Sequence, residues 1–431
     1  INQEAVDRLE RNVDYRAAAG SKGSWIPARE VYTFRTEDEM LSRFLRLLVL
    51  SLILLSLASP GFAARRSSLG GNLLIKDMDD IFFLPQRVVD YNRTLAFDYG
   101  SSNGLGSGGM IFGSESMTFG AFAHRSDFLG AIPNAFNTIG DIMTLSNDGQ
   151  NDLGGSLGSA GPAGGPYNWI DVLFGFMGGE NPMGIRLSVG RAQDDTTPAG
   201  GTEDKSNVTS VDVVFGVSIN DIDMSAEVAF ATAKDEVGAD KTESSPVGFA
   251  VMARKTAMDE SEDLVLGWLG SFQYLTGGAD VSGATTVDNK ITNLGFTAGV
   301  GPVYMPTDRT VVAMYGTFEY MNSTDETTTG GATTKTTDVD YVIPGWRIAG
   351  EVEIASWLQW RGGLVSRYVI SQDKDEDAGG EDKFNESFLE YSWHTGLGFT
   401  LGDFMLDTYI HPDVITSGTD LLGNSSDLFG M

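Results

Sequence analysis

Ionic side chains recur at alternating positions within apolar stretches of the chain. Arg347 and Glu351, for example, alternate with Trp346, Ile348 and Val352. In an extended strand this spacing places the ionic groups on one face and the apolar groups on the other. Arginines and carboxylates that share an enclosed face can set the selectivity of a pore, or they can pair and hold the interior together. We predict that ten residues face such an interior: Asp171, Arg186, Asp212, Glu227, Arg254, Arg347, Glu351, Glu353, Arg361 and Arg367.

Residue types that carry out catalysis are sparse in this chain. It has no Cys and three His, which excludes thiol catalysis, disulfides and Cys-based zinc sites. His124 is followed by Ser126 and Asp127, but neighbours in sequence do not make a catalytic triad. Residues 373–379 read D-x-D-x-D-x-G, a loose form of a calcium loop with its Gly one place late, so a calcium site is a minor alternative. We predict no catalytic residue, no cofactor and no metal site, and we do not expect an enzyme.

The composition is acidic and rich in glycine. Among 431 residues there are 54 Gly, and the formal net charge is −30. An acidic chain cannot neutralise nucleic-acid phosphates, so we predict no nucleic-acid partner. Most of the negative charge lies in long polar connections, where it favours solvated loops. Bridging of lipopolysaccharide phosphates by divalent cations is the alternative.

The dominant sequence period after residue 116 is two, which predicts β-strands. Short and long connections alternate between these segments, as in outer-membrane barrels with short periplasmic turns and long outer loops. The sequence therefore predicts an all-β fold, a transmembrane antiparallel up-and-down β-barrel of about 14 strands, with 13 present and the last one truncated. A soluble β-sandwich or β-helix is the alternative. The thirteen predicted strands are residues 117–125, 168–177, 183–191, 206–219, 223–233, 245–255, 263–275, 290–302, 309–320, 338–354, 358–370, 384–401 and 404–411.

Aromatic residues lie near the ends of these segments. Tyr and Trp prefer the level of the lipid headgroups, where one end of the ring is wet and the other apolar. We predict an aromatic girdle made of Trp268, Tyr274, Tyr320, Trp357, Trp360, Tyr368, Tyr391 and Trp393.

The N-terminal part contains an export signal. Arg43 and Arg46 precede an apolar run at residues 47–58, and Gly61 and Ala63 supply small residues for cleavage. This three-part layout predicts a secretory signal peptide at residues 40–64. Residues 1–39 are then an upstream segment outside the mature protein. We assign residues 65–116 to a plug inside the barrel or to a periplasmic segment, and residues 117–431 to the barrel.

Three local patterns resemble a known group of proteins. Residues 344–351 read P-x-x-R-x-x-G-E, residues 357–363 read W-L-x-x-R-x-G, and residues 77–85 read D-M-D-D-I-F-F-L-P. With the barrel layout, they resemble the long-chain fatty-acid transporter-like superfamily of Gram-negative outer-membrane proteins. The resemblance implies a barrel with an N-terminal plug, but it assigns no ligand-contacting residue here.

These observations predict a location in the cell outer membrane and a transport function. We expect a channel or transporter for passive uptake of small solutes, including hydrophobic ones. The alternative is a structural or interaction barrel that transports nothing, such as a surface scaffold or secretion-system accessory. The expected partners are outer-membrane lipid, lipopolysaccharide, the outer-membrane assembly machinery and an unidentified small solute.

Overall fold

The computed structural model describes residues 64–98, 107–114, 116–123, 168–196, 204–237, 240–256, 263–282, 287–307, 309–377, 379–401 and 404–410. All of them belong to one unit, Leu57–Met431. The upstream segment 1–39 and almost all of the expected signal peptide lie outside the described residues. No helix among the described residues is long and apolar enough to cross a membrane.

The described chain begins with short helices and continues as strands. The helices are α3 (Ala64–Ser68), η1 (Met78–Phe82) and η2 (Pro85–Tyr91). The strands are β1 (Thr94–Asp98), β2 (Ser107–Ser114), β3 (Met117–Ala123), β4 (Asn168–Gly178), β5 (Asn181–Thr196), β6 (Asp204–Ile219), β7 (Ile222–Val237), β8 (Asp240–Ser244), β9 (Val247–Lys255), β10 (Leu264–Ser282), β11 (Val287–Thr307), β12 (Thr310–Thr329), β13 (Ala332–Ala355), β14 (Leu358–Asp377), β15 (Gly380–Leu401) and β16 (Phe404–Ile410).

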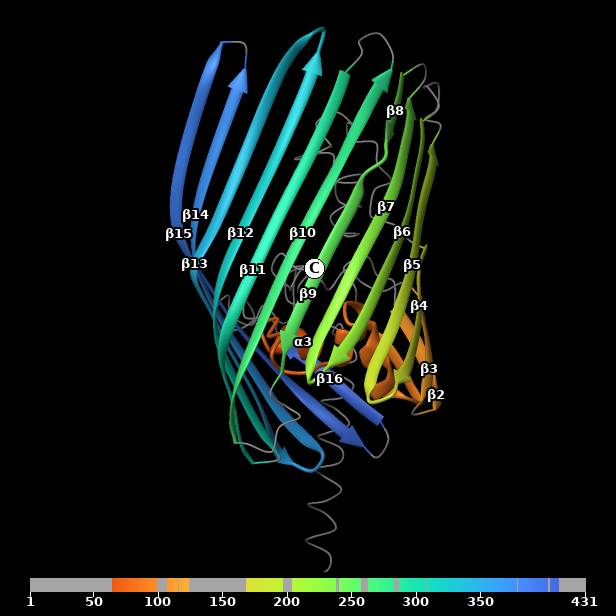
Figure 1. The fold of residues 1–431 in the computed structure, drawn as a ribbon, viewed down its shortest axis with the longest axis vertical. Coiled ribbons are helices and arrows are strands. Elements are labelled where there is room, and N and C mark those ends of the chain that lie inside the picture. The colour runs from red at the N-terminus through yellow and green to blue at the C-terminus, as the bar shows by residue number, and fades with distance from the viewer. Residues whose placement is uncertain are drawn as a thin grey trace, which may run out of the picture. The chain divides into compact units, whose positions relative to one another are not determined.

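All described strands form one antiparallel sheet in which each strand pairs with its neighbour in sequence (Figure 1). β8 and β9 both pair with β7 and β10, so together they fill one position. Pro246 separates them, and a proline has no N–H for the ladder. The sixteen strands thus occupy fifteen positions. The predicted all-β, antiparallel up-and-down barrel fold is confirmed, with fifteen described positions instead of the thirteen expected in this chain.

The thirteen predicted strands correspond to the positions from β3 to β16. Two features differ from the prediction. β1 and β2 extend the sheet before β3, so the sheet starts at Thr94 and not at Met117. Much of the sequence predicted as long loops is strand instead, because β5, β7, β10, β12 and β14 all continue beyond their predicted ends. After β12 and β14 the chain turns back only at Gly330–Gly331 and just after Asp377. The apolar alternation that marks a strand stops there, while Thr-rich and charged residues continue the hydrogen-bond ladder.

Tight turns join several strands at the opposite end of the sheet. Asn220 and Asp221 connect β6 to β7 with φ angles of 49° and 63°, the positive values that a two-residue hairpin turn of type I′ needs. Ser356 and Trp357 form a connection of the same length, two residues, between β13 and β14. The predicted short turns at these two places are confirmed.

The strands have an apolar outer face and a mixed inner face. On β6, Val213 and Phe215 are 40% and 42% exposed, whereas Asp212 and Val214 are fully buried. β3 alternates between exposed and buried residues along its whole length. Inside the barrel, residues from the helices and the segment between them form a buried core with inward side chains of the strands. In Figure 1 these helices, coloured orange, lie within the curve of the sheet towards its lower end.

Candidate functional site: the barrel interior

The N-terminal segment, residues 64–92, passes across the inner wall of the barrel. Asp77 caps η1 by accepting a hydrogen bond from the Asp79 N–H, and the Asp80 side chain accepts from the Asp77 N–H. Pro85 starts η2, where the missing N–H of a proline costs nothing. These local signals fix two short helical turns in a stretch with no regular apolar period. The apolar residues of the segment are buried: Leu69, Leu73, Leu74, Ile75, Ile81, Phe82, Phe83, Leu84 and Val88.

Glycines on the wall make room for this segment. A Cβ atom added at any of six wall glycines would lie within 3.0 Å of an atom of the segment, a distance that real Cβ atoms essentially never show. At Gly184 and Gly363 the atoms that come this close belong to the backbone of the segment, at Pro85 and Gln86 and at Leu69 respectively. The wall is therefore shaped to the segment on strands far apart in the sheet. The six glycines are Gly175, Gly184, Gly216, Gly267, Gly363 and Gly396.

A chain of buried ion pairs joins the segment to β7 and β9. Asp80 accepts hydrogen bonds from Arg66 of the segment and from Arg254 of the wall. Arg254 also contacts Asp223 at 3.3 Å and donates to the Leu73 carbonyl at 3.0 Å, and Arg87 reaches Asp223 at 2.9 Å. Burial alone would raise the pKa of Asp80, but Arg254 and Arg66 hold that pKa below its ordinary value. Asp80 is therefore a carboxylate at neutral pH.

A second ionic cluster surrounds Arg186 on β5. Its guanidinium donates to Asp212 and to the carbonyl oxygen of Phe82 in the segment. Asp171 and Glu227 lie at 3.9 and 4.0 Å from it. All four side chains are at most 2% exposed, so the cation holds three buried carboxylates on neighbouring strands. Breaking such a buried group is costly because a charge is left without its partner.

The third ionic group lies on β13, β14 and β16. Arg65 of the segment and Arg361 of the wall approach Glu351 at 3.0 and 2.6 Å, and Arg361 also donates to Asp407. Arg347 donates to the Gly70 carbonyl at 3.0 Å. Three residues of the late-strand patterns, Arg347, Glu351 and Arg361, therefore hold the N-terminal segment in place, directly or through one another.

The structure places nine of the ten predicted interior residues in these ionic groups or next to them. Arg367 is the least buried of the nine and contacts Glu319 at 3.1 Å and Glu390 at 3.0 Å. The tenth, Glu353, lies outside the groups and faces the exposed Arg309 at 3.9 Å. The sequence prediction missed Asp223 and Glu319. Asp223 has the strand periodicity of Glu227, which was predicted to face inward. Glu319 has the periodicity of the buried Tyr315 on the same strand, so alternation could have found both residues.

The eight predicted girdle residues are all partly or largely exposed, seven of them on strands and Trp357 in the turn between β13 and β14. Tyr391 is 78% exposed, Trp360 45% and Tyr368 40%. Trp360 also donates from Nε1 to the Thr395 hydroxyl at 3.1 Å. The residues of the D-x-D-x-D stretch lie on β14, where Asp377 accepts from the Gly379 and Gly380 N–H groups and so caps the hairpin turn.

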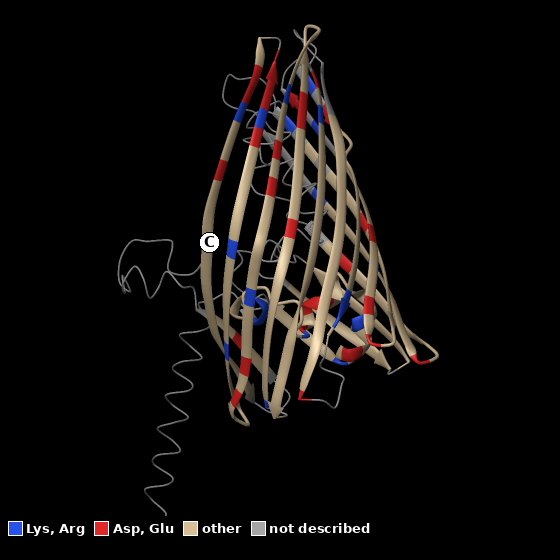
Figure 2. Ribbon diagram, turned by 60° about the vertical axis from the view of Figure 1, so that its left-hand side comes forward, with Lys and Arg blue, Asp and Glu red and all other residues tan. Residues whose placement is uncertain are grey.

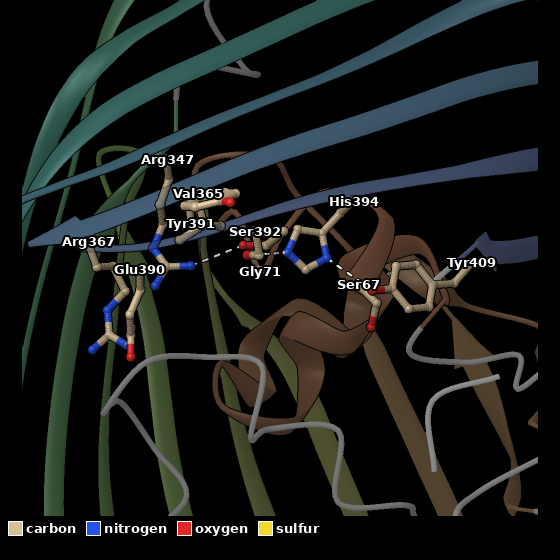
Figure 3. Close-up of a pocket in the computed structure, with 11 residues that line it drawn as sticks. Ser67, Gly71, Arg347, Val365, Arg367, Glu390, Tyr391, Ser392, His394 and Tyr409 are labelled. Carbon is tan, nitrogen blue, oxygen red and sulfur yellow. Dashed lines mark hydrogen bonds and ion pairs between the residues drawn. The ribbon is translucent and has the colours of Figure 1, made fainter. Parts of the chain in front are cut away.

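A pocket of about 420 Å³ lies between the segment and the wall formed by β13–β16 (Figure 3). His394 extends into it from β15, with Nε2 at 2.9 Å from the Ser392 hydroxyl and Nδ1 at 3.2 Å from the Tyr409 hydroxyl. The rings of His394 and Tyr409 are stacked, with centroids 6.0 Å apart. Ser67 and Gly71 of the segment line the opposite side. The sequence prediction did not single out this pocket.

Comparison with known proteins yields only distant likeness. No known protein family matches the sequence, and no curated protein matches it. Among solved structures, the ferric yersiniabactin uptake receptor FyuA from Yersinia pestis is similar with a TM-score of 0.37 and 11% identity, over 55% of this chain and 43% of that one. The siderophore receptor PiuA from Acinetobacter baumannii gives a TM-score of 0.35 and 8% identity, over 61% and 51%. The chain thus spans about half the length of these structures. The resemblance to the fatty-acid transporter-like superfamily stays a prediction.

Proposed function

We propose that this chain is an outer-membrane channel or transporter, and that its N-terminal segment restricts passage of small solutes through the barrel. The observation that carries the proposal is the docking of residues 64–92 on the inner wall through three ionic groups, two of them buried and one partly buried. A barrel that served only as a scaffold would have no need to bind a separate segment at six shaped wall positions.

The outer face supports a membrane location. Apolar side chains such as Val213 and Phe215 of β6 and Phe230 of the paired strand β7 are exposed, and an apolar surface that continues across strands is a liability in water but not in lipid. Each strand between the two edges of the described sheet, from β2 to β15, has a paired strand on both sides, the arrangement that lipid requires. The signal peptide expected at residues 40–64 would deliver the chain to the outer membrane, with lipid, lipopolysaccharide and the assembly machinery as partners.

The length of the strands indicates that a large part of the barrel extends beyond the bilayer. A tilted strand crosses with about 9–11 residues, whereas β13 has 24. Figure 2 shows charged residues along the upper parts of the long strands. Beside the β14–β15 turn, for example, Lys374 and Glu381 lie 3.4 Å apart. These extensions favour a second candidate function, an interaction barrel that presents its outer hairpins to a partner.

Conductance of the refolded full chain in planar bilayers tests the transport proposal. We expect small or rare openings from the complete protein, and larger steady openings when residues 64–92 are deleted. Uptake of neutral and charged dyes into liposomes should rise in the same order. Absence of conductance and dye uptake from both forms, each shown to be folded by its circular dichroism, would reject transport and leave the interaction barrel.

A further inference from the structure

The pocket between the segment and β13–β16 presents more cations than carboxylates. Among its described lining residues, Arg347 and Arg367 carry guanidinium groups, and Glu390 is the single carboxylate. Glu319 pairs with both arginines, at 3.7 and 3.1 Å, but it is 1% exposed and does not line the pocket. A solute would therefore meet two guanidinium groups and one carboxylate, while Glu319 behind them balances the charge of the group as a whole.

A carboxylate from a solute can replace Glu390 as the ion-pair partner of Arg367. The Glu390 side chain is 45% exposed and that of Arg367 27%, and an ion pair in contact with water contributes little. Arg367 holds Glu390 through Nη1, whereas its Nη2 holds the buried Glu319 and its Nε is itself buried. A carboxylate from a solute can accept a charge-assisted hydrogen bond from Nη1, so it can take the place of Glu390 without leaving a buried charge unpaired.

The rest of the pocket is suited to a flat, apolar part of a ligand, such as an aromatic ring. Val365 and the stacked rings of His394 and Tyr409 form one side, as Figure 3 shows. Aromatic rings favour offset stacking or edge contact with another ring. The hydroxyl groups of Ser67 and Ser392 can form hydrogen bonds with polar substituents on the ring of a ligand.

We propose that this pocket binds a small aromatic carboxylate, with its carboxylate on Arg367 and its ring near Val365, His394 and Tyr409. This inference rests on the proposed function, for which it names the class of solute. Because Ser67 and Gly71 belong to the N-terminal segment, the solute touches the segment and the wall together. Occupancy of the pocket therefore affects the contact between the segment and the wall, which restricts passage through the barrel.

Binding of benzoate to the refolded full chain in detergent micelles, followed by saturation-transfer NMR, tests the proposal. We expect a Kd of about 1 mM and at least tenfold weaker binding of benzamide, which has the same ring without the charge. Arg367→Gln should weaken benzoate binding at least tenfold, whereas Glu390→Gln should strengthen it about threefold because it removes the competing carboxylate. Arg309→Gln, which changes an exposed arginine outside the pocket, should leave binding unchanged.

The opposite signs of the two pocket variants separate a carboxylate site from general destabilisation. Equal binding of benzoate and benzamide, equal binding of inorganic phosphate, or no benzoate binding at all would overturn the proposal. Weaker binding by both variants would do so as well, because Glu390 would then support the ligand and not compete with it. The measurement needs no membrane, so a folded protein that binds benzoate without conducting would reject transport alone, and one that conducts without binding would reject this site alone.

Discussion

Replacement of Arg254 by Gln should release the N-terminal segment from the wall. Arg254 is fully buried and contacts Asp80, Asp223 and the Leu73 carbonyl. Removal of one partner from a buried ion pair typically costs about 3–5 kcal/mol. We expect the lower end, about 3 kcal/mol, because Asp80 keeps Arg66 and Asp223 keeps Arg87. At 1.4 kcal/mol per factor of ten, the population of undocked segment should rise roughly 100-fold.

Absence of cysteine from the chain provides the assay. A single Leu74→Cys substitution places a thiol at a fully buried position of the segment. Its labelling by a maleimide follows the undocked population when docking is faster than labelling. The rate should rise roughly 100-fold with Arg254→Gln and stay constant with Arg309→Gln, whose side chain is 62% exposed. An unchanged rate in Arg254→Gln would show that the ionic contact does not hold the segment, and would refute the reasoning.

Three further predictions concern the same interior. Arg186→Met leaves three buried carboxylates without the cation they share, so the free energy of unfolding measured in urea should fall by about 3–5 kcal/mol; a change below 1 kcal/mol would contradict the buried cluster. Gly363→Ala forces a Cβ against the segment backbone and should speed labelling of Leu74→Cys, as overpacking costs about 1–3 kcal/mol. The matched Gly270→Ala, with no atom closer than 4.0 Å, should not. Since the folded pKa of Asp80 is lowered, its contribution to docking is complete above about pH 4 and is lost as the pH falls through that lower value. Conductance should therefore stay level from pH 7 to about pH 4 and rise only in more acid solution, with a smaller rise in Asp80→Asn.

The positions of the strands could be predicted because one face of each strand is exposed and apolar. The same alternation placed Arg186, Arg254 and Arg361 on the inner side. It could not show where β12–β15 end, because beyond the apolar band both faces are polar and only the hydrogen-bond ladder marks the strand. Thr-rich residues that looked like loop are paired along the whole of the β12–β13 hairpin.

The contact between the segment and the wall could not be predicted from sequence. Residues 64–92 show no regular period, and the pairs that hold them are distant in the chain, such as Arg65 with Glu351 at a separation of 286 residues. Two patterns that the sequence did reveal, residues 77–85 and residues 344–351, contact the same buried interior from opposite sides. Their shared role depends on a fold that brings together segments more than 250 residues apart in the sequence.

The number of strand positions has a consequence for the two edges of the sheet. Successive strands reverse direction, so the first and the fifteenth positions, β1 and β16, run the same way. Direct pairing of these two strands would have to be parallel, unlike every other pairing in the described sheet. A strand that bonded to both edges would instead run antiparallel to each, complete both rows of N–H and C=O groups, and bring the circuit to sixteen positions, the even parity of bacterial barrels.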